Sequence, residues 1–592
     1  MCGIIGVLGN NFPKKEKFEK AREALSHRGL DDRGLFYNPE ESIALGHRRL
    51  SIIDLSNSGR QPFVSDDGRF VLVYNGEIYN YLELKKELAG KYSFKTGTDT
   101  EVLLAAFKVW GRECLKRLNG MFAFALWDSE KKKLFCARDR LGVKPFFYFI
   151  KNGTFYFSSE IKGLLALGVD RIPNERIIFD YLCHGFYDHT NETFFAGIKT
   201  LRAGHFLVWH KERASHGIFW DLSDVAPRHE NLNDEGVREQ FKEILVDAIK
   251  IRFRSDVPIG INLSSGLDSN SLLYYSKKIL NKDVNTFSMR YPSTEYDEGR
   301  LIETYLTASQ KRRWHTAIIN PKSIFEDAVS MNIVQDQPFG GIPTIAYARL
   351  NEIARARETT VLLEGQGMDE LLAGYEYYRP EYEKDLRGVP VRRLLGNHAA
   401  LSLSQDLSLQ IGGEILSPQF VKDHTGKRND FIRKGLFGTH LMNAQYRDIV
   451  ATKLPRVLRF NDHVSMAYGR ELRLPYLDYR LVEFCFFLPS RYKINAQWQK
   501  VLMREAVGPY LPKVVSMAQK KSFGKVQGEW FRKHHKATIY SFLESPSFKK
   551  RNYWNYTALM KKTDSFFNGE YNNSFFIWQC INLELWFRKF ID

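Results

Sequence analysis

A predicted strand, a loop of small residues and a predicted helix follow one another near the middle of the chain, and this order strongly limits the fold. The strand covers residues 257–263, the helix starts at Asn270, and the loop between them reads Ser264-Ser265-Gly266-Leu267-Asp268-Ser269. Such an order is typical of an α/β domain with a parallel sheet. The loop presents backbone N–H groups and a positive helix end to a pyrophosphate group. It lacks the Gly-Lys-Ser/Thr ending of a Walker loop, so transfer of a γ-phosphate is not predicted.

The chain has 592 residues, which is too long for one hydrophobic core, so we expect two large domains. Residues 1–222 contain short apolar runs separated by Gly, Asn and Asp, which predict several strands, few helices and stacked sheets. Residues 223–235 are polar and turn-rich and form the predicted linker. Residues 236–592 continue as the α/β domain and become largely helical from about residue 380.

Cys2 directly follows the initiator methionine, and its small side chain permits removal of Met1 by an aminopeptidase. An N-terminal cysteine then carries a nucleophile and a base on one residue. Its α-amine, with a typical pKa of about 7.7–8.0, can accept the thiol proton. A cysteine at this position means little by itself, and its neighbours decide the interpretation.

Five short motifs occur in order in the first part of the chain, at residues 2–6, 26–34, 46–54, 74–80 and 98–101. Together they resemble the glutaminase domain of glutamine-hydrolysing asparagine synthetases, in the class II N-terminal-nucleophile amidotransferases. The resemblance covers essentially the whole first domain. It implies an α+β domain of stacked antiparallel sheets with helices, and it implies glutamine as a substrate.

Carried over position by position, the resemblance implies a complete glutaminase site. It assigns Cys2 as the nucleophile, the Asn75 side chain and the Gly76 backbone N–H as the oxyanion hole, and Arg49, Asn75, Glu77 and Asp99 as contacts to glutamine. The chemistry agrees, because an arginine suits a carboxylate and acidic residues suit an ammonium group. We expect a turn at Asn75-Gly76 that aims the backbone N–H at the oxyanion.

The loop after residue 263 resembles that of the N-type ATP pyrophosphatases, which cleave ATP to AMP and pyrophosphate. The resemblance implies that ATP contacts Leu263, Ser264, Ser265, Gly266, Leu267, Asp268, Ser269, Gly365 and Gln366. Asp268 and Asp369, with Glu370 as a further candidate, would hold Mg²⁺, which takes one or two carboxylates plus phosphate oxygens. Ser265 stands where the family has glycine, and a left-handed backbone there would strain a serine.

Two later segments, 461–466 and 471–478, resemble the helical part that closes the synthetase site. Residues 519–524 resemble the Lys-x-Gly-Phe stretch of the family. By that match Lys520 would act as a point charge that stabilises acyl-adenylate formation and the departing pyrophosphate. Two sites in one chain also imply a buried route for ammonia, lined by apolar and small residues.

Three positions depart from the family pattern and bear on the acceptor. Gln366 stands where Glu is common, Glu364 where Ser is common, and Gln337 follows Asp336 where many relatives have Asp-Glu-Pro. We expect aspartate as the acceptor and asparagine as the product, with a uronic acid of a surface polysaccharide pathway as the alternative. A third interpretation is an inactive scaffold or binding protein that retains the fold. Changed carboxylates near the acceptor alter its electrostatics and its proton acceptor.

The formal net charge of +17 is spread along the chain and indicates a solvated basic surface or an anionic partner. We do not expect nucleic acid, because no binding module is found among these residues. No window holds the roughly 18 uncharged apolar residues of a membrane span, and the N-terminus lacks the basic start of a signal peptide. Six scattered cysteines indicate reduced thiols, so a cytoplasmic location is expected, and a homodimer is the default assembly.

Overall fold

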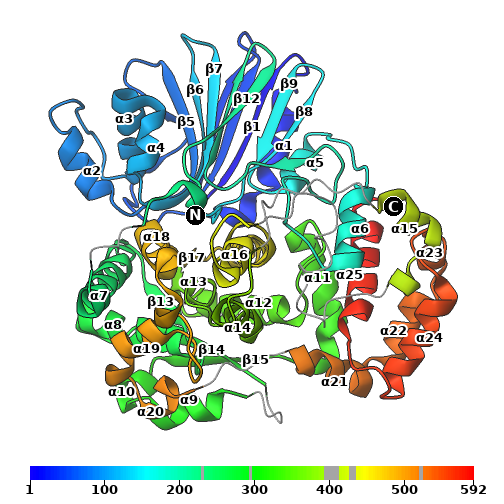
Figure 1. The fold of residues 1–592 in the computed structure, drawn as a ribbon. Helices are drawn as coiled ribbons and strands as arrows, with labels where there is room; N and C mark the ends of the chain where they lie inside the picture. The colour runs from blue at the N-terminus through cyan, green and yellow to red at the C-terminus, as the bar shows by residue number, and fades with distance from the viewer. Residues whose placement is uncertain (228–231, 292–296, 392–412, 426–434, 519–523) are drawn as a thin grey trace.

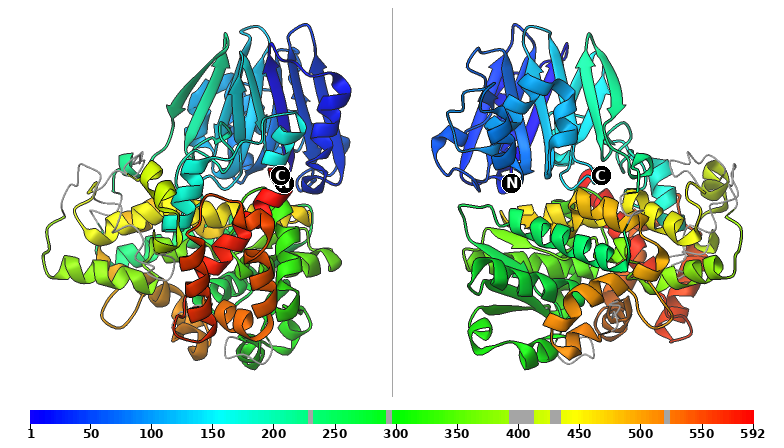
Figure 2. Two further views of the ribbon diagram at one scale, coloured as in Figure 1. Left: turned by 90° about the vertical axis from the view of Figure 1, so that its right-hand side faces the viewer. Right: turned by 60° about the vertical axis from the view of Figure 1, so that its left-hand side comes forward.

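The computed structural model describes residues 1–227, 232–291, 297–391, 413–425, 435–518 and 524–592. Figure 1 shows two domains, with the sheets of the first above and a helix-rich second domain below. The same division appears from two other sides in Figure 2. The N-terminus lies between the two domains, so the first residues of the chain are in contact with both.

The first domain is built on two six-stranded antiparallel sheets. The first sheet has the order β10 (Lys199–Thr200), β8 (Phe147–Lys151), β9 (Thr154–Ser158), β1 (Gly3–Gly9), β3 (Ile43–Arg49) and β2 (Asp32–Asn38). The second has the order β12 (Arg213–Ile218), β11 (His205–His210), β7 (Lys133–Arg138), β6 (Gly120–Asp128), β5 (Phe70–Ile78) and β4 (Phe63–Val64). The predicted α+β domain of stacked antiparallel sheets is therefore confirmed.

Alternating side chains explain why the two sheets stack with helices outside them. In β1, Ile4 belongs to the apolar layer between the sheets, and Ile5 belongs to the outer layer under α1 (Lys15–Glu23) and α5 (Ile161–Ala166). In β5, Val71 faces the layer between the sheets, and Leu72 packs with α2 (Tyr81–Leu88) and α3 (Asp99–Trp110). The result is a sandwich of helices, sheet, sheet and helices.

The second domain is built on a parallel sheet, which confirms the predicted α/β class. Its order is β15 (Trp314–Ile318), β14 (Asn285–Arg290), β13 (Ile259–Asn262), β16 (Val361–Leu363) and β17 (Glu471–Arg473). The larger helices of the central region are α7 (Asp234–Ile251), α8 (Leu267–Leu280), α11 (Ile324–Gln335), α12 (Ile342–Ala356), α17 (Leu454–Ala467) and α18 (Tyr479–Phe487). Its shorter helices are α9 (Gly299–Tyr305), α10 (Ala308–Lys311), α13 (Met368–Leu371), α14 (Arg379–Leu386), α15 (Pro418–His424), α16 (His440–Arg447), α19 (Val501–Val507), α20 (Lys513–Ser516) and α23 (Pro546–Lys549), whereas the short helix α4 (Cys114–Arg117) belongs to the first domain.

The strand order of this sheet fixes where ligands bind. From β13 the chain moves outward through β14 to β15, and it then returns to the other side of β13 to form β16 and β17. In open α/β sheets, ligands bind at the carboxyl ends of the strands where the order reverses. The loops that follow β13 and β16 therefore flank the expected ligand crevice.

Three local predictions need correction. Asn75 and Gly76 form no turn, because both lie inside β5, where a Cβ on Gly76 would stand 2.2 Å from the Met121 carbonyl oxygen of β6. The segment 471–478 is not helical throughout, since it begins with strand β17. Helix α8 starts at Leu267, ahead of the predicted start at Asn270, and so places Asp268 in its first turn.

A C-terminal group of helices joins the two domains. It contains α21 (Gly524–His534), α22 (Lys536–Leu543), α24 (Tyr556–Phe567) and α25 (Phe575–Phe590). Helix α25 runs beside α6 (Glu175–His184) of the first domain (Figure 1), and Gln579 bonds to the Tyr181 carbonyl oxygen between them. In the described part of the chain, no helix is both long and apolar enough to cross a bilayer.

Candidate active sites

The start of the chain is buried between the domains. The α-ammonium group of Met1 lies 3.2 Å from Glu471 Oε2 of β17, and both side chains are fully buried. Arg28 fixes the next residue, because its Nε donates to the Cys2 carbonyl oxygen at 3.1 Å. The first two residues are therefore held in place from both domains.

The Cys2 thiol is buried, with Sγ 4.0 Å from the Leu50 carbonyl oxygen, and burial raises its pKa. A buried thiol of this kind needs a base before it can act as a nucleophile. While Met1 is attached, the Cys2 nitrogen is an amide, which donates to Asn75 Oδ1 at 2.9 Å and cannot accept a proton. Removal of Met1 would convert that nitrogen into an amine on the same residue as the thiol.

Several buried polar atoms around the start of the chain have no hydrogen-bond partner among the described residues, and two of them lie on β5. These two are Asn75 Nδ2 and Glu77 Oε1. A buried polar group without a partner costs about 1–3 kcal/mol, so a ligand that pairs with it regains that energy. Nδ2 is a donor suited to an oxyanion, and Oε1 is an acceptor suited to an ammonium group.

Strand geometry places the Gly76 N–H on the edge of β5 that faces away from β6. The Tyr74 N–H donates to Gln61 Oε1 at 2.7 Å and the Ile78 N–H donates to Asp99 Oδ2 at 3.0 Å, both on the edge of β5 away from β6. Along a strand, the N–H groups of every second residue point to the same edge. The Gly76 N–H, between those of Tyr74 and Ile78, therefore lies on that edge too. The strand geometry is therefore compatible with the predicted second oxyanion donor, although the predicted turn is absent.

Arg49 and Asp99, the other two predicted contacts to glutamine, each bond to protein groups near Cys2. The Arg49 guanidinium bonds to the carbonyl oxygens of Ser56 and Asp54 at 2.8 and 2.5 Å, and its charge offsets part of the rise that burial causes in the pKa of Cys2. Asp99 accepts a hydrogen bond from the Tyr74 hydroxyl at 2.8 Å, and burial raises its pKa to about 6.

Replacing Asn75 with alanine tests the oxyanion donor. We expect kcat for glutamine hydrolysis to fall by about 10²–10³, because one preorganised donor to the tetrahedral intermediate is lost. Synthesis from added ammonia should stay near the wild-type rate, because that reaction bypasses Cys2. Glutamate release and product formation with each nitrogen donor measure the two rates. Unchanged glutamine hydrolysis would remove Asn75 from the site.

The loop after β13 offers its backbone donors to oxygen atoms. The Ser264 N–H donates to Ser269 Oγ at 3.0 Å, and the Ser265 N–H donates to the Glu298 carboxylate at 2.9 Å. The loop thus already accommodates an anionic oxygen, as the predicted pyrophosphate contact requires. Ser265 does not adopt a positive φ, so the predicted strain at this serine is absent.

Lys500 joins the two predicted metal ligands. Its Nζ lies 2.5 Å from Asp268 Oδ2 and 2.7 Å from Asp369 Oδ1, and the two carboxylates raise its pKa. Two carboxylates that reach one cation also fit the needs of Mg²⁺. Gly374 makes room, since a Cβ there would stand 2.0 Å from Asp369 Oδ1. Sequence reasoning missed Lys500, because no motif surrounds it and a lone lysine is ordinarily exposed.

The remaining predicted ATP contacts lie beside these groups, except for Lys520. Gly365 follows β16, and a Cβ on it would stand 2.8 Å from the Asp268 Cβ. Gln366 Nε2 donates to the Tyr347 hydroxyl at 3.3 Å. Lys520 lies outside the described residues, so its predicted role stays a prediction.

A buried network of charges crosses the domain interface near Cys2. Arg28 lies 2.7 Å from Glu160 and 2.8 Å from Asp462 of α17. Glu160, Asp336 and His463 are close enough to hold a metal ion. Lys162, however, already bonds to both of these carboxylates. Lysine and arginine therefore neutralise the cluster without a metal.

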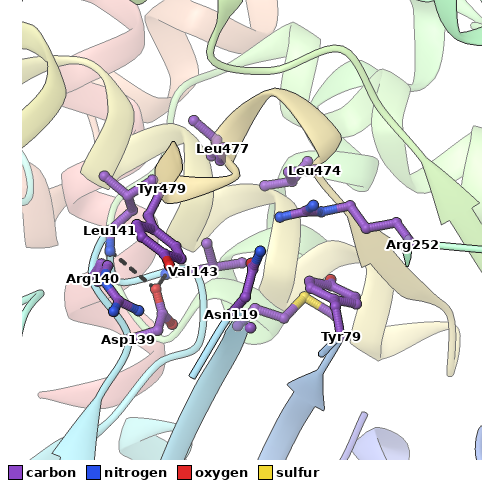
Figure 3. A pocket seen from close by; sticks show the side chains of 12 residues that line it. Tyr79, Asn119, Asp139, Arg140, Leu141, Val143, Arg252, Leu474, Leu477 and Tyr479 are labelled. Atoms are coloured by element: carbon purple, nitrogen blue, oxygen red, sulfur yellow. Dashed lines mark hydrogen bonds between the residues drawn. The ribbon is translucent and has the colours of Figure 1, made fainter. Parts of the chain in front are cut away.

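A small pocket also lies between the domains (Figure 3). Tyr79 lines it from the first domain, and Arg252, Leu474 and Leu477 line it from the second. Its volume of about 20 Å³ has room for one water-sized molecule. Tyr79 and the two leucines belong to the apolar cluster that also contains the buried Met1 side chain.

Comparison with known proteins divides the chain in two. A family model described as a glutamine amidotransferase domain matches residues 1–220, and one described as asparagine synthase matches residues 240–588. A putative asparagine synthetase of Methanocaldococcus jannaschii is 36% identical over 69% of this chain and 82% of its own length. Asparagine synthetase 3 of Bacillus subtilis is 29% identical over 89% and 87%. The amidase chry2 of Gibberella zeae is 29% identical over 88% of each chain.

Proposed function

Because this chain belongs to the family of glutamine-hydrolysing asparagine synthetases, we propose that it hydrolyses glutamine at Cys2 and transfers the ammonia to an acyl-adenylate. Enzymes of this family use ATP as a substrate. The observation that carries the glutaminase assignment is the pair of buried, unpartnered atoms beside Cys2, Asn75 Nδ2 and Glu77 Oε1. In this proposal residues 1–222 form the glutaminase domain and residues 236–592 the synthetase domain, joined by 223–235.

The proposed glutaminase reaction begins at Cys2. Sγ attacks the carboxamide carbon of glutamine while the α-amine, exposed by removal of Met1, takes the thiol proton. The developing oxyanion receives hydrogen bonds from Asn75 Nδ2 and the Gly76 N–H. Ammonia leaves with that proton, and water then releases glutamate from the thioester. Arg49, Glu77 and Asp99 hold the amino-acid end of the substrate.

The synthetase reaction takes place at the carboxyl ends of β13 and β16. A carboxylate oxygen of the acceptor attacks the α-phosphorus of ATP, and pyrophosphate leaves toward the loop 263–269. Lys500 and Lys520 supply positive charge to the phosphate oxygens. Asp268 and Asp369 would hold Mg²⁺, which neutralises the phosphates when bound. Ammonia then attacks the acyl carbon, and AMP leaves.

The two sites need a protected route for ammonia, because in water ammonia becomes ammonium and loses its nucleophilic lone pair. The apolar cluster around Met1 contains residues of both domains, including Leu50, Met121, Leu474 and Leu477. Removal of Met1 would empty a side-chain volume in this cluster beside Cys2. We assign the route to that space and to the small pocket, whose lining includes Met121, Leu474 and Leu477 of the same cluster.

Aspartate is the first candidate acceptor, because several relatives are named as asparagine synthetases. One observation favours a second candidate, a carboxylate without an ammonium group, such as a uronic acid. An ammonium group needs an anionic partner, and three carboxylates of this region already have a cation: Asp268 and Asp369 share Lys500, and Asp336 is paired with Lys162. Among the described residues this leaves Glu364 as the candidate partner for an ammonium group. The net charge of +17 also favours an acceptor with further negative charge, such as a nucleotide-linked uronic acid.

A panel of acceptors tests the choice. ATP–pyrophosphate exchange is measured with aspartate, with simple uronic acids and with nucleotide-linked uronic acids. Exchange with aspartate alone supports asparagine synthesis. Exchange with a uronate but not with aspartate replaces asparagine synthesis with uronate amidation. Glutamine hydrolysis without exchange for any carboxylate would contradict acyl-adenylate formation itself.

A further inference from the structure

Glu364 occupies a central position in the second domain. It directly follows β16, and its N–H donates to the Arg473 carbonyl oxygen of β17 at 3.0 Å. Its side chain is 2% exposed. This position is at the carboxyl end of the strand that adjoins β13, where the strand order reverses and ligands bind.

The side chain of Glu364 is held by uncharged groups. Asn262 Nδ2, at the end of β13, donates to Oε1, and Asn461 Nδ2, on α17, donates to Oε2 at 3.3 Å. The Tyr347 hydroxyl of α12 also bonds to this carboxyl group. Within the described part of the chain, Glu364 forms no ion pair.

The other buried carboxylates around it are paired with cations. Asp268 and Asp369 share Lys500, Asp462 pairs with Arg28, and Glu471 pairs with Arg473 and the N-terminal ammonium group. A carboxylate that is paired with a cation holds its proton weakly and is a poor proton acceptor at neutral pH.

The elements packed against Glu364 present few charges to it. The Arg473 side chain turns to Glu471 and Glu77, and Asp462 and His463 on α17 bond elsewhere, to Arg28 and to the Arg459 carbonyl oxygen. Burial without a counter-ion therefore raises the pKa of Glu364 to about 7. That value suits a group that accepts and returns a proton near neutral pH.

We propose that Glu364 is the proton acceptor of the amide-forming step. The nitrogen lone pair of ammonia forms the C–N bond at the acyl carbon, which leaves a positive charge on nitrogen. The Glu364 carboxylate takes one N–H proton, the bond from carbon to the AMP oxygen breaks, and the amide and AMP result. The protonated Glu364 then returns its proton to water. This inference rests on the proposed function and assigns a catalytic residue within it.

The position of Glu364 relative to the glutaminase site supports this role. Asn461, which bonds to Glu364, precedes Asp462, and Asp462 bonds to the arginine that holds the Cys2 carbonyl oxygen. Glu364 thus lies on the side of the synthetase site that is connected to the source of ammonia. The next polar side chain of its loop, Gln366, bonds to the same Tyr347.

The Glu364→Gln variant separates this role from acceptor binding. We expect glutamine hydrolysis and ATP–pyrophosphate exchange within about threefold of wild type, because neither needs this proton transfer. Amide formation should fall by about 10²–10⁴, the usual contribution of a general base. Single-turnover amide formation from preformed acyl-adenylate should rise with pH through about 7 in the wild type, because the carboxylate is the active form. That rise should be absent from the variant.

Two further variants complete the test. Glu364→Asp keeps a carboxylate and should retain more amide formation than Glu364→Gln, because a displaced base can still accept the proton. The double variant Glu364→Gln/Gln366→Glu places a carboxylate beside the same Tyr347 and should recover part of the lost rate. Glutamine hydrolysis by each variant reports that it is folded.

Three outcomes would overturn the assignment. Wild-type amide formation by Glu364→Gln would show that no proton passes through this residue. Parallel loss of exchange and amide formation in Glu364→Gln would make it an acceptor-binding residue. A wild-type enzyme that forms no acyl-adenylate with any acceptor would instead overturn the proposed function, and this role with it.

Discussion

Replacing Cys2 with alanine is expected to abolish glutamine hydrolysis and glutamine-dependent synthesis while leaving synthesis from added ammonia intact. The Cys2 sulfur is the only atom that the proposal uses to attack glutamine, and an alanine offers no nucleophile. Loss of a covalent nucleophile typically lowers kcat by at least about 10⁴-fold. Acyl-adenylate formation occurs in the other domain and does not involve the thiol. Glutamate release and product formation with glutamine or ammonium chloride measure the separation.

Cys114→Ala provides the matched control. Cys114 is also buried, but it packs in the apolar cluster under α2 and α3, and in the described part of the chain its side chain bonds to no group of the site. Its loss should leave both nitrogen donors active. If Cys2→Ala eliminated the ammonia-dependent reaction too, the division of labour between the domains would be wrong. The intact mass of active wild-type enzyme should lack Met1, and active enzyme that keeps Met1 would exclude the α-amine as the base.

The sequence predicts those catalytic positions that residues adjacent in the chain define. A cysteine beside the initiator and a loop of small residues between strand and helix are recognisable because neighbouring residues define them. The fold class was predictable for the same reason. Short apolar runs between turn residues mark the strands of the first half, and helical spacing of apolar residues marks the second half. An Asn-Gly pair is most often a turn. It was therefore mispredicted here, where glycine is needed for close approach of β5 to β6.

Buried charges could not be predicted from the chain alone. Lys500 and Glu471 look like surface residues, because a charged side chain is rarely buried unless a partner accompanies it. Both partners of Lys500 lie far away in sequence, in α8 and α13, and one of the partners of Glu471 lies at the N-terminus. The three-residue strand β17 was missed for the same reason, since two of its residues are charged.

Replacing Lys500 with methionine should stop the synthetase half-reaction without affecting the glutaminase. Methionine keeps most of the side-chain volume, so the main change is loss of the charge between Asp268 and Asp369. Removing one partner from a buried charge group leaves the other charges uncompensated. The phosphate oxygens of ATP would then meet two carboxylates without their lysine. We expect ATP–pyrophosphate exchange to fall by about 10²–10³, the usual effect of losing one electrostatic contact in a transition state.

The dependence on Mg²⁺ distinguishes this role from a purely structural one. If the two carboxylates bind the metal, a higher Mg²⁺ concentration should partly restore exchange in Lys500→Met, because a divalent cation replaces the lost charge between them. Lys513→Met, in the exposed helix α20, removes a lysine outside the site and should behave as wild type. Exchange at the wild-type rate in Lys500→Met would exclude Lys500 from the reaction. Loss of glutamine hydrolysis together with exchange would show that the residue maintains the fold of the chain rather than the chemistry of one site.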